Sequence, residues 1–102
     1  MSEFLLLYRL PEGHVNTDAD VSAWNDWLTA LGDDLLDVGR PVTRTSHIGS
    51  QPTAMRLTGF STIAALDLRA AEDIARRCPA VASGGVVEIG EVVAMPEGHG
   101  PQ

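Results

Sequence analysis

Apolar residues run without interruption through the first segment that the pattern predicts as a strand, residues 3–9, where Phe4 is followed by three leucines. Such a run leaves no polar face, so both faces of this strand are expected to be buried. Helices of the same chain can cover one face, but 102 residues supply no second layer for the other. The pattern therefore predicts that a partner subunit covers the second face.

A helix is predicted next, because apolar residues recur at intervals of three and four along one stripe. Thr17 or Asp18 can cap its start, and Gly39 is the expected stop. Three aspartates near its end are unfavourable for the helix dipole, so this helix depends on packing. The stripe consists of Val21, Trp24, Leu28, Leu31 and Leu35.

The remainder reads as two strands, a helix and a last strand. Pro41 is expected to open a strand over 42–48, followed by a turn over 49–52 and a strand over 55–65 with a bulge or close approach at Gly59. Asp67 is expected to cap a helix that Pro79 stops after Cys78. A strand over 86–93 completes one domain, residues 1–95, and residues 96–102 are expected to be a disordered tail.

This order, βαββαβ, predicts an α+β ferredoxin-like fold with a four-stranded antiparallel sheet and both helices on one side. The last predicted strand also has apolar residues on both faces, with Val87 and Ile89 on one and Val86 and Val92 on the other. Two such sheets packed face to face would form a dimeric α/β barrel. We therefore expect a homodimer joined through its sheet faces.

Composition narrows the class of function. Fourteen acidic and seven basic residues give a net charge of −7, which disfavours nucleic acid and anionic membranes as partners. No apolar run is long enough for a membrane span, and the start of the chain has no secretion signal, so a cytoplasmic location is expected. One cysteine, Cys78, excludes an internal disulfide, and three scattered histidines do not make a metal site. No cofactor is expected.

Three segments carry a resemblance to a known family: residues 27–39, residues 58–63, and Cys78-Pro79 followed by residues 84–89. In their order and spacing they resemble the YCII-related family, which includes the proteins named for a DGPF tetrapeptide. The similarity covers residues 3–94. It implies a ferredoxin-like fold assembled as a dimeric barrel, in a family most of whose members have no established activity.

Two departures limit what the resemblance implies about chemistry. Family members with a proposed enzymatic role have a histidine on the first helix, paired with an aspartate as an acid/base dyad. Residues 21–37 contain no histidine here, and the nearest positions are Trp27 and Leu28. The DGPF tetrapeptide is also absent. That chemistry is therefore not transferred to this chain.

The expected topology brings several basic residues to one rim of the domain, which can attract a carboxylate or phosphate. Alternatively, these are solvated charges balanced by nearby acids. The rim residues are Arg9, His14, His47, Arg56, Arg76 and Arg77.

Among single residues, His47 is the candidate for acid/base catalysis, because imidazole titrates near neutral pH and its strand is expected to face the cleft. A structural role is the alternative for His47. Tyr8 can point its hydroxyl into a pocket or complete the core. Trp24 fits the core stripe, whereas Trp27 lies off its centre and can line a cleft or the dimer seam. Candidate ligand-binding residues are Tyr8, Arg9, His14, Trp27, His47 and Arg56.

Two functions follow from these residues. The first is a small-molecule binding or accessory homodimer without catalysis, favoured by the missing helix histidine. The second is a cofactor-independent lyase or oxygenase acting on a small anionic substrate in the barrel cleft, with His47 near Tyr8 and the arginines. Whether the protein is an enzyme stays open at this point.

Overall fold

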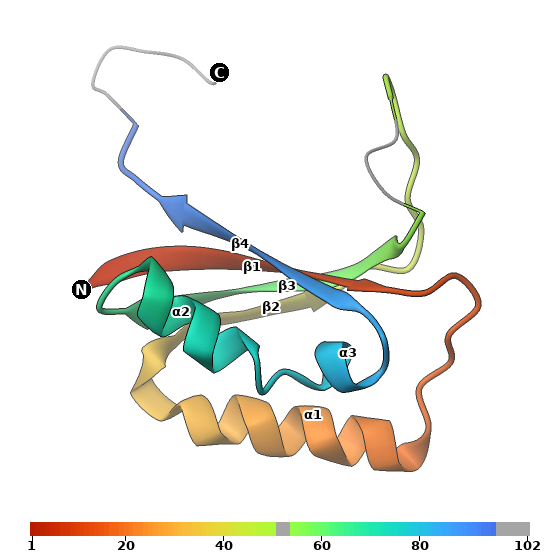
Figure 1. Cartoon of the computed structure of the whole chain (residues 1–102), viewed down its shortest axis with the longest axis horizontal. Helices are drawn as coiled ribbons and strands as arrows, with labels where there is room; N and C mark the ends of the chain where they lie inside the picture. The colour runs from red at the N-terminus through yellow and green to blue at the C-terminus, as the bar shows by residue number, and fades with distance from the viewer. Residues whose placement is uncertain (51–53, 96–102) are drawn as a thin grey trace.

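Four antiparallel strands form one sheet in the order β2-β3-β1-β4. The structure is a computed structural model that describes residues 1–50 and 54–95. The strands are β1 (Ser2–Leu10), β2 (Leu35–Pro41), β3 (Arg56–Ala65) and β4 (Val86–Val92). The helices α1 (Asp18–Leu31), α2 (Leu68–Ala75) and α3 (Pro79–Ala82) all lie on one side of the sheet (Figure 1). The expected α+β class with a four-stranded antiparallel sheet is confirmed, and the arrangement is compatible with a ferredoxin-like fold.

β1 divides its apolar residues between the two faces of the sheet. Phe4, Leu6, Tyr8 and Leu10 are buried, whereas the leucines between them are only partly buried. Because directly paired residues share a face, Ile63 and Ser61 of β3, opposite Phe4 and Leu6, belong to the helix-covered face. The open face carries the other set. These residues are Glu3, Leu5, Leu7 and Arg9 of β1, Leu57, Phe60 and Thr62 of β3, and Val86, Glu88 and Val92 of β4.

α1 begins where the sequence predicts and ends earlier. Thr17 is its N-cap in a complete capping box: Thr17 Oγ1 accepts from the Asp20 N–H at 3.1 Å, and Asp20 Oδ2 accepts from the Thr17 N–H at 2.9 Å. The helix ends at Gly32, whose φ of +56° breaks the helical path, and a 3₁₀ turn over Gly32–Asp34 follows. The expectation that the helix continues through Leu35 to Gly39 is therefore wrong.

The second strand occupies Leu35–Pro41, not the expected 42–48. Leu35 pairs with Ile63 of β3, so its apolar side chain packs on the sheet and does not extend the helix stripe. The N–H of Val42 still donates to the Thr58 carbonyl at 2.9 Å, but residues 43–50 are exposed and lie outside the sheet. Threonine, arginine and serine dominate residues 43–46 and provide little apolar surface to bury. The burial that Leu35 gains outweighs the alternating pattern of the later segment.

Two irregularities in the β2–β3 register give β2 its shape, one between Leu35 and Asp37 and one between Asp37 and Arg40. At the second, Gly39 has φ +73°, and its N–H donates to Asp37 Oδ1 at 2.8 Å. A Cβ atom built on Gly39 would lie 1.7 Å from the Phe60 carbonyl oxygen. Glycine is thus required at this position both by backbone conformation and by the closeness of β3.

The later elements follow the sequence expectation closely. The β1–β3 register shifts between Tyr8 and Arg9, next to Gly59, which confirms the expected irregularity. Asp67 caps α2 by accepting from the Ala70 N–H at 2.9 Å. α2 ends at Ala75, and Pro79 then opens the short α3, a role that the sequence reading does not include. The predicted turn residues Gln51 and Pro52 and the predicted tail, 96–102, lie outside the described residues.

We predict that Gly39→Ala lowers the free energy of unfolding by at least about 3 kcal/mol, because a clash with β3 adds to the strain of a positive φ. Gly13→Ala is the matched control, since Gly13 has φ +82° and a Cβ there meets nothing within 4 Å. It should cost only about 1 kcal/mol. Urea unfolding of both variants is the measurement, and equal losses would contradict the steric role of Gly39.

Candidate functional site

A cavity of about 310 Å³ lies between α1 and the β2–β3 side of the sheet. It is on the helix-covered face, near the end of the domain where β1 ends and α1 begins. Most of its lining is apolar. The lining residues are Tyr8, Leu10, Asn16, Val21, Trp24, Asn25, Leu28, Val38, Gly39, Arg40, Pro41, Thr58, Gly59, Phe60 and Ser61.

Three aromatic side chains fix α1 against β1 beside this cavity. The Tyr8 and Trp24 ring centroids are 4.8 Å apart, Trp24 and Trp27 are 5.8 Å apart, and Tyr8 and Trp27 are 6.1 Å apart. All three pairs meet edge to face, the arrangement that ring quadrupoles favour. Trp27 is buried, whereas Trp24 is partly exposed and lines the cavity. The Trp24 indole therefore forms both core and cavity wall.

The strand wall is built by hydroxyl groups that bridge neighbouring strands. Ser61, which is 1% exposed, donates from Oγ to the Val38 carbonyl at 2.7 Å. Thr58 Oγ1 donates to the Tyr8 carbonyl at 3.2 Å. The hydroxyl hydrogens of Ser61 and Thr58 are thus already used within the fold: the Ser61 bond joins β3 to the irregular β2, and the Thr58 bond joins β3 to β1.

The hydroxyl of Tyr8 has no such partner. Tyr8 is 5% exposed, and its Oη is buried without a hydrogen bond from any described residue. The ring lies over Gly59, where a Cβ would be 3.6 Å from Tyr8 Cδ2. Burial raises the pKa of Tyr8 to about 12; the Ser61 hydroxyl opposes this rise and the Cys78 thiol adds to it. The Tyr8 ring therefore forms part of the cavity wall, while its neutral hydroxyl is buried beneath the accessible surface near Ser61 and Cys78.

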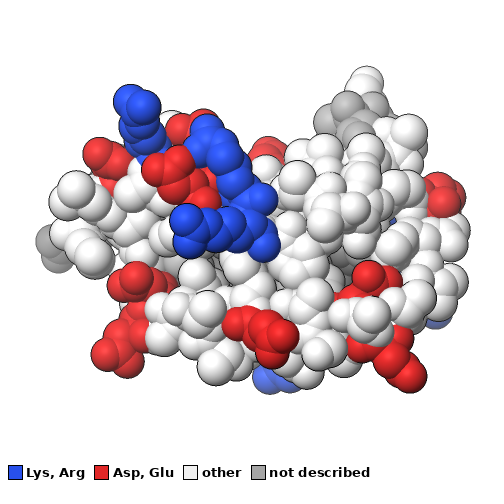
Figure 2. All heavy atoms as spheres, turned by 60° about the horizontal axis from the view of Figure 1, so that its bottom comes forward, with Lys and Arg blue, Asp and Glu red and all other residues white. Residues whose placement is uncertain are grey.

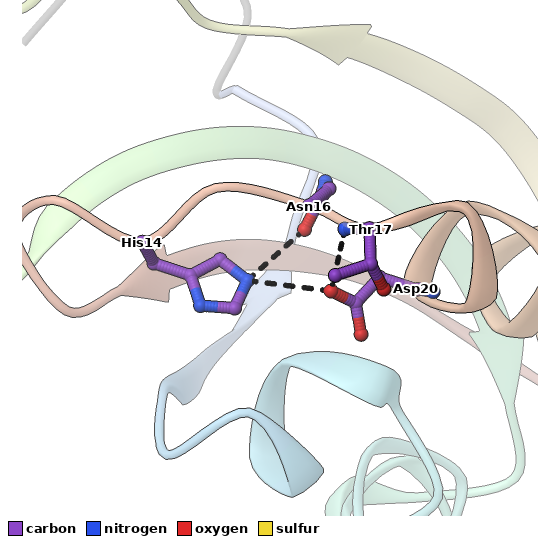
Figure 3. Close-up of polar contacts among 4 residues, drawn as sticks. All are labelled: His14, Asn16, Thr17 and Asp20. Carbon is purple, nitrogen blue, oxygen red and sulfur yellow. Dashed lines mark hydrogen bonds and ion pairs between the residues drawn. The ribbon is translucent and has the colours of Figure 1, made fainter.

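A polar cluster stands beside the cavity at the start of α1 (Figure 3). His14 Nε2 lies 3.1 Å from Asn16 Oδ1 and 3.8 Å from Asp20 Oδ2. Because both oxygens are acceptors, this arrangement favours the form in which Nε2 carries hydrogen. The pKa of Asp20 is lowered mainly by the hydrogen bond that its carboxylate accepts from the Thr17 N–H. The Thr17 side chain and His14 lower this pKa further, whereas burial opposes the lowering. Of this cluster, Asn16 itself lines the cavity.

Few ionisable side chains line the cavity. Among the described residues of the lining these are Tyr8 and Arg40, and burial raises the pKa of Tyr8 to about 12. Cys78 is buried in the core, where loss of hydration raises the pKa of its thiol to about 12. Among residues 1–50 and 54–95, no group of three or more His, Cys, Asp or Glu side chains could hold a metal ion. The lining thus lacks a general base, a thiolate and a metal centre.

The structure brings only one of the six predicted ligand-binding residues, Tyr8, into the cavity lining. His14 lies next to it through Asn16. Arg9 is on the open face of the sheet, where its Nη2 lies 3.3 Å from Glu88 Oε1. Trp27 is core and lines a separate hollow of about 200 Å³ near the end of α1. Trp24 thus packs on the core as expected and also lines the cavity, whereas Trp27 is the more buried of the two.

His47 and Arg56 do not reach the cavity lining either. His47 is exposed in the segment that follows β2, so its expected place on a strand facing the cleft is wrong. The physical reason is the earlier position of β2, which leaves His47 beyond the sheet. Arg56 is partly buried and donates from Nη1 to the Val42 carbonyl at 3.4 Å.

The predicted basic rim is divided. Arg77 lines the smaller hollow with Leu31 and Asp34, at the opposite end of α1 from His14. Arg76 pairs with Asp73. Basic side chains gather on one part of the helix-bearing face, with acidic side chains around them (Figure 2). The pairing of Arg9, His14 and Arg76 with carboxylates agrees with the alternative of balanced, solvated charges.

Sequence reasoning misses most of the cavity wall. Asn25 and Leu28 follow from the helix period, once Trp24 is placed at the cavity. The wall formed by residues 38–41 depends on the irregular register of β2, which no local pattern reveals. Ser61 carries a detectable signal, since a serine alternates with apolar residues on a predicted strand.

Comparisons with family models, curated proteins and solved structures find no match to this chain. The similarity to the YCII-related family therefore stays a prediction from the sequence. No helix among the described residues has the length and apolar character needed to cross a membrane.

We predict that Asp20→Asn destabilises the protein at pH 7 and that the difference from the parent shrinks below about pH 4. The lowered pKa of Asp20 in the folded state stabilises the fold above the unfolded pKa, and this contribution is lost as pH falls through the folded value. Thermal unfolding from pH 7 to pH 2.5 measures it. Asp26→Asn, an exposed carboxylate on the same helix, is the control. A pH-independent difference would contradict the capping role.

Proposed function

We propose that this protein binds a small, largely apolar molecule in the cavity between α1 and the β2–β3 side of the sheet. The observation that carries the proposal is the cavity itself, whose volume of about 310 Å³ falls at the lower end of the range for ligand sites. Apolar lining with a few polar groups is typical of such sites. Asn16 and Asn25 supply these groups.

A binding role fits the lining better than acid/base catalysis does. The lyase or oxygenase alternative requires His47 to lie close to Tyr8 in the cleft. His47 is instead exposed and lies outside the cavity lining. Ser61 donates its hydrogen to a backbone carbonyl, with no histidine hydrogen-bonded to it. For a small anionic ligand, the described lining offers one positively charged side chain, Arg40, and this side chain is exposed. The cytoplasmic location expected from the sequence stays a prediction.

We also propose that a second copy of this chain covers the open face of the sheet. Val86 and Val92 are 45% and 42% exposed there, and Leu5, Leu7 and Leu57 lie on the same face without a covering layer. The segments that follow β2 and β4 rise on the side opposite the helices (Figure 1), and they expose Ile48, Val93 and Met95. Arg9 and Glu88 share this face and form an ion pair at 3.3 Å. Such a self-complementary apolar surface suits a two-fold dimer, as the YCII-related resemblance also implies.

Indole is a suitable first probe of cavity binding, because it is small, flat and mostly apolar. We expect indole to shift the NMR signals of Trp24 and Leu28, with a dissociation constant in the millimolar range typical of small fragments. Val21→Trp should weaken binding at least about ten-fold by filling the cavity mouth. Ala23→Trp, at an exposed α1 position outside the lining, is the control. If indole binds both variants equally, the cavity is not its site.

The proposed dimer is tested by sedimentation at micromolar concentration. The parent chain should sediment as a dimer, and Leu7→Glu should sediment as a folded monomer because a charge on the open face opposes burial. Leu68→Glu, an exposed leucine on the helix layer, should remain dimeric. A monomeric parent protein would rule out the interface.

A further inference from the structure

The polar cluster beside the cavity fixes the hydrogen-bonding role of one lining residue, Asn16. We propose that the amide nitrogen of Asn16 donates a hydrogen bond to an uncharged oxygen acceptor, such as a carbonyl, at one end of an otherwise apolar ligand. His14 is then a positioning residue, because it holds the Asn16 amide in the orientation that leaves this nitrogen to the ligand. The inference rests on the proposed function, because it assigns the ligand chemistry of the same cavity.

The orientation of the Asn16 amide follows from the acceptors around His14. His14 Nε2 lies 3.8 Å from Asp20 Oδ2, and an ionised carboxylate only accepts hydrogen bonds, so Nε2 carries a hydrogen. Nε2 then donates to Asn16 Oδ1 at 3.1 Å, which turns the amide oxygen towards His14 and the amide nitrogen away from it (Figure 3). Because Nε2 also carries a hydrogen in the imidazolium form, the amide keeps this orientation when His14 titrates.

The Asn16 nitrogen is left without a partner in the fold. No hydrogen bond joins it to residues 1–50 or 54–95, and Asn16 is exposed and lines the cavity, so a ligand can reach it. Ser61 and Thr58 already donate their hydroxyl hydrogens to backbone carbonyls, and Tyr8 Oη is buried beneath the accessible surface. Asn25 is exposed, and no hydrogen bond with the described residues fixes which way its amide faces. Asn16 therefore supplies the donor whose direction the fold sets in advance.

The apolar part of the ligand is expected to lie beyond Asn16 along α1. Asn16 directly precedes the N-cap, and Val21, Trp24 and Leu28 follow at helical spacing and also line the cavity. An apolar lining with a polar group at one end favours a molecule that is divided in the same way. The volume of about 310 Å³ accommodates one ring with a short substituent.

An uncharged acceptor suits the polar end of the cavity better than a carboxylate does. Asp20 belongs to the same cluster and is ionised at neutral pH, because the hydrogen bond from the Thr17 N–H lowers its pKa. The chain as a whole also has a net charge of −7. Both charges oppose an anion placed beside Asn16. A carbonyl oxygen accepts the amide hydrogen without adding a further negative charge.

Three probes of similar size test the acceptor: acetophenone has a carbonyl, ethylbenzene has no polar group, and indole only donates. Dissociation constants are measured by NMR titration on the parent chain and on Asn16→Asp, in which an oxygen replaces the amide nitrogen. We expect the parent to bind acetophenone about three-fold more tightly than ethylbenzene, as one neutral hydrogen bond allows. Asn16→Asp should abolish this preference and leave ethylbenzene binding unchanged. It should strengthen indole binding about two-fold, since a carboxylate accepts from the indole N–H.

The positioning role of His14 is tested with two variants that differ in hydrogen bonding. In His14→Gln the side-chain amide nitrogen takes the place of Nε2 and still donates to Asn16 Oδ1, so the preference for acetophenone should be retained. His14→Phe removes the donor, and most of the preference should be lost because the Asn16 amide is free to turn. Thermal unfolding should show that all three variants are folded.

The other outcomes overturn the inference in distinguishable ways. Equal binding of acetophenone and ethylbenzene to the parent, or a preference that persists in Asn16→Asp, removes the role of Asn16 but leaves cavity binding intact. A preference that persists in His14→Phe removes the positioning role of His14. Binding of benzoate more tightly than acetophenone, weakened in Arg40→Gln, assigns the polar end to an anion. If none of these probes binds, the proposed function fails together with the inference.

Discussion

Edge-to-face packing of Tyr8, Trp24 and Trp27 is the contact on which the arrangement of helix and sheet depends. Trp27 is the one buried residue of α1, and α1 meets Tyr8 of β1 through this cluster. α2 instead buries Ala71 and Ala75, whose small side chains allow a helix to approach a sheet closely. α1 packs on the sheet through large aromatic side chains, and the cavity lies beside them.

The second constraint is the irregular path of β2. Gly39 adopts a positive φ at a point where β3 leaves no room for a side chain, and Ser61 binds the neighbouring Val38 carbonyl. A regular strand would keep every side chain in alternation and would not present consecutive residues 38–41 to the cavity. The wall is therefore made by backbone irregularity as much as by residue type, and the hydrogen bonds of the strand wall hold it in place.

Much of the fold is predictable from local signals. The apolar run of β1 and the caps at Thr17 and Asp67 are encoded within a few residues. The structure of residues 32–48 is not predictable from local signals, because Gly32 and Gly39 are equally good candidates for a helix end. The sheet determines which glycine ends the helix, because Leu35 is partly buried when it pairs with Ile63 of β3. A local sequence pattern does not contain this long-range contact.

The candidate site is less predictable than the fold for the same reason. Moving the start of β2 from the expected residue 42 to Leu35 takes His47 out of the sheet and puts residues 38–41 beside the cavity. Tyr8 is predictable because it lies in a strand whose position is fixed by its own apolar run. The helix period alone does not predict that Trp24 lines the cavity while Trp27 is buried.

The proposed ligand cavity and the proposed subunit interface lie on opposite faces of the sheet. The sequence expectation places a ligand in a cleft of the dimeric barrel, but the lining comes from α1, β1, β2 and β3, with the segment before α1, of a single chain. The apolar residues available to a second copy lie on the other face, where no helix covers them. One layer of strands therefore separates the cavity from the proposed interface. Association through the open face would bury apolar residues of β1 and β3 on the side away from the helices. It would not add a residue to the cavity lining.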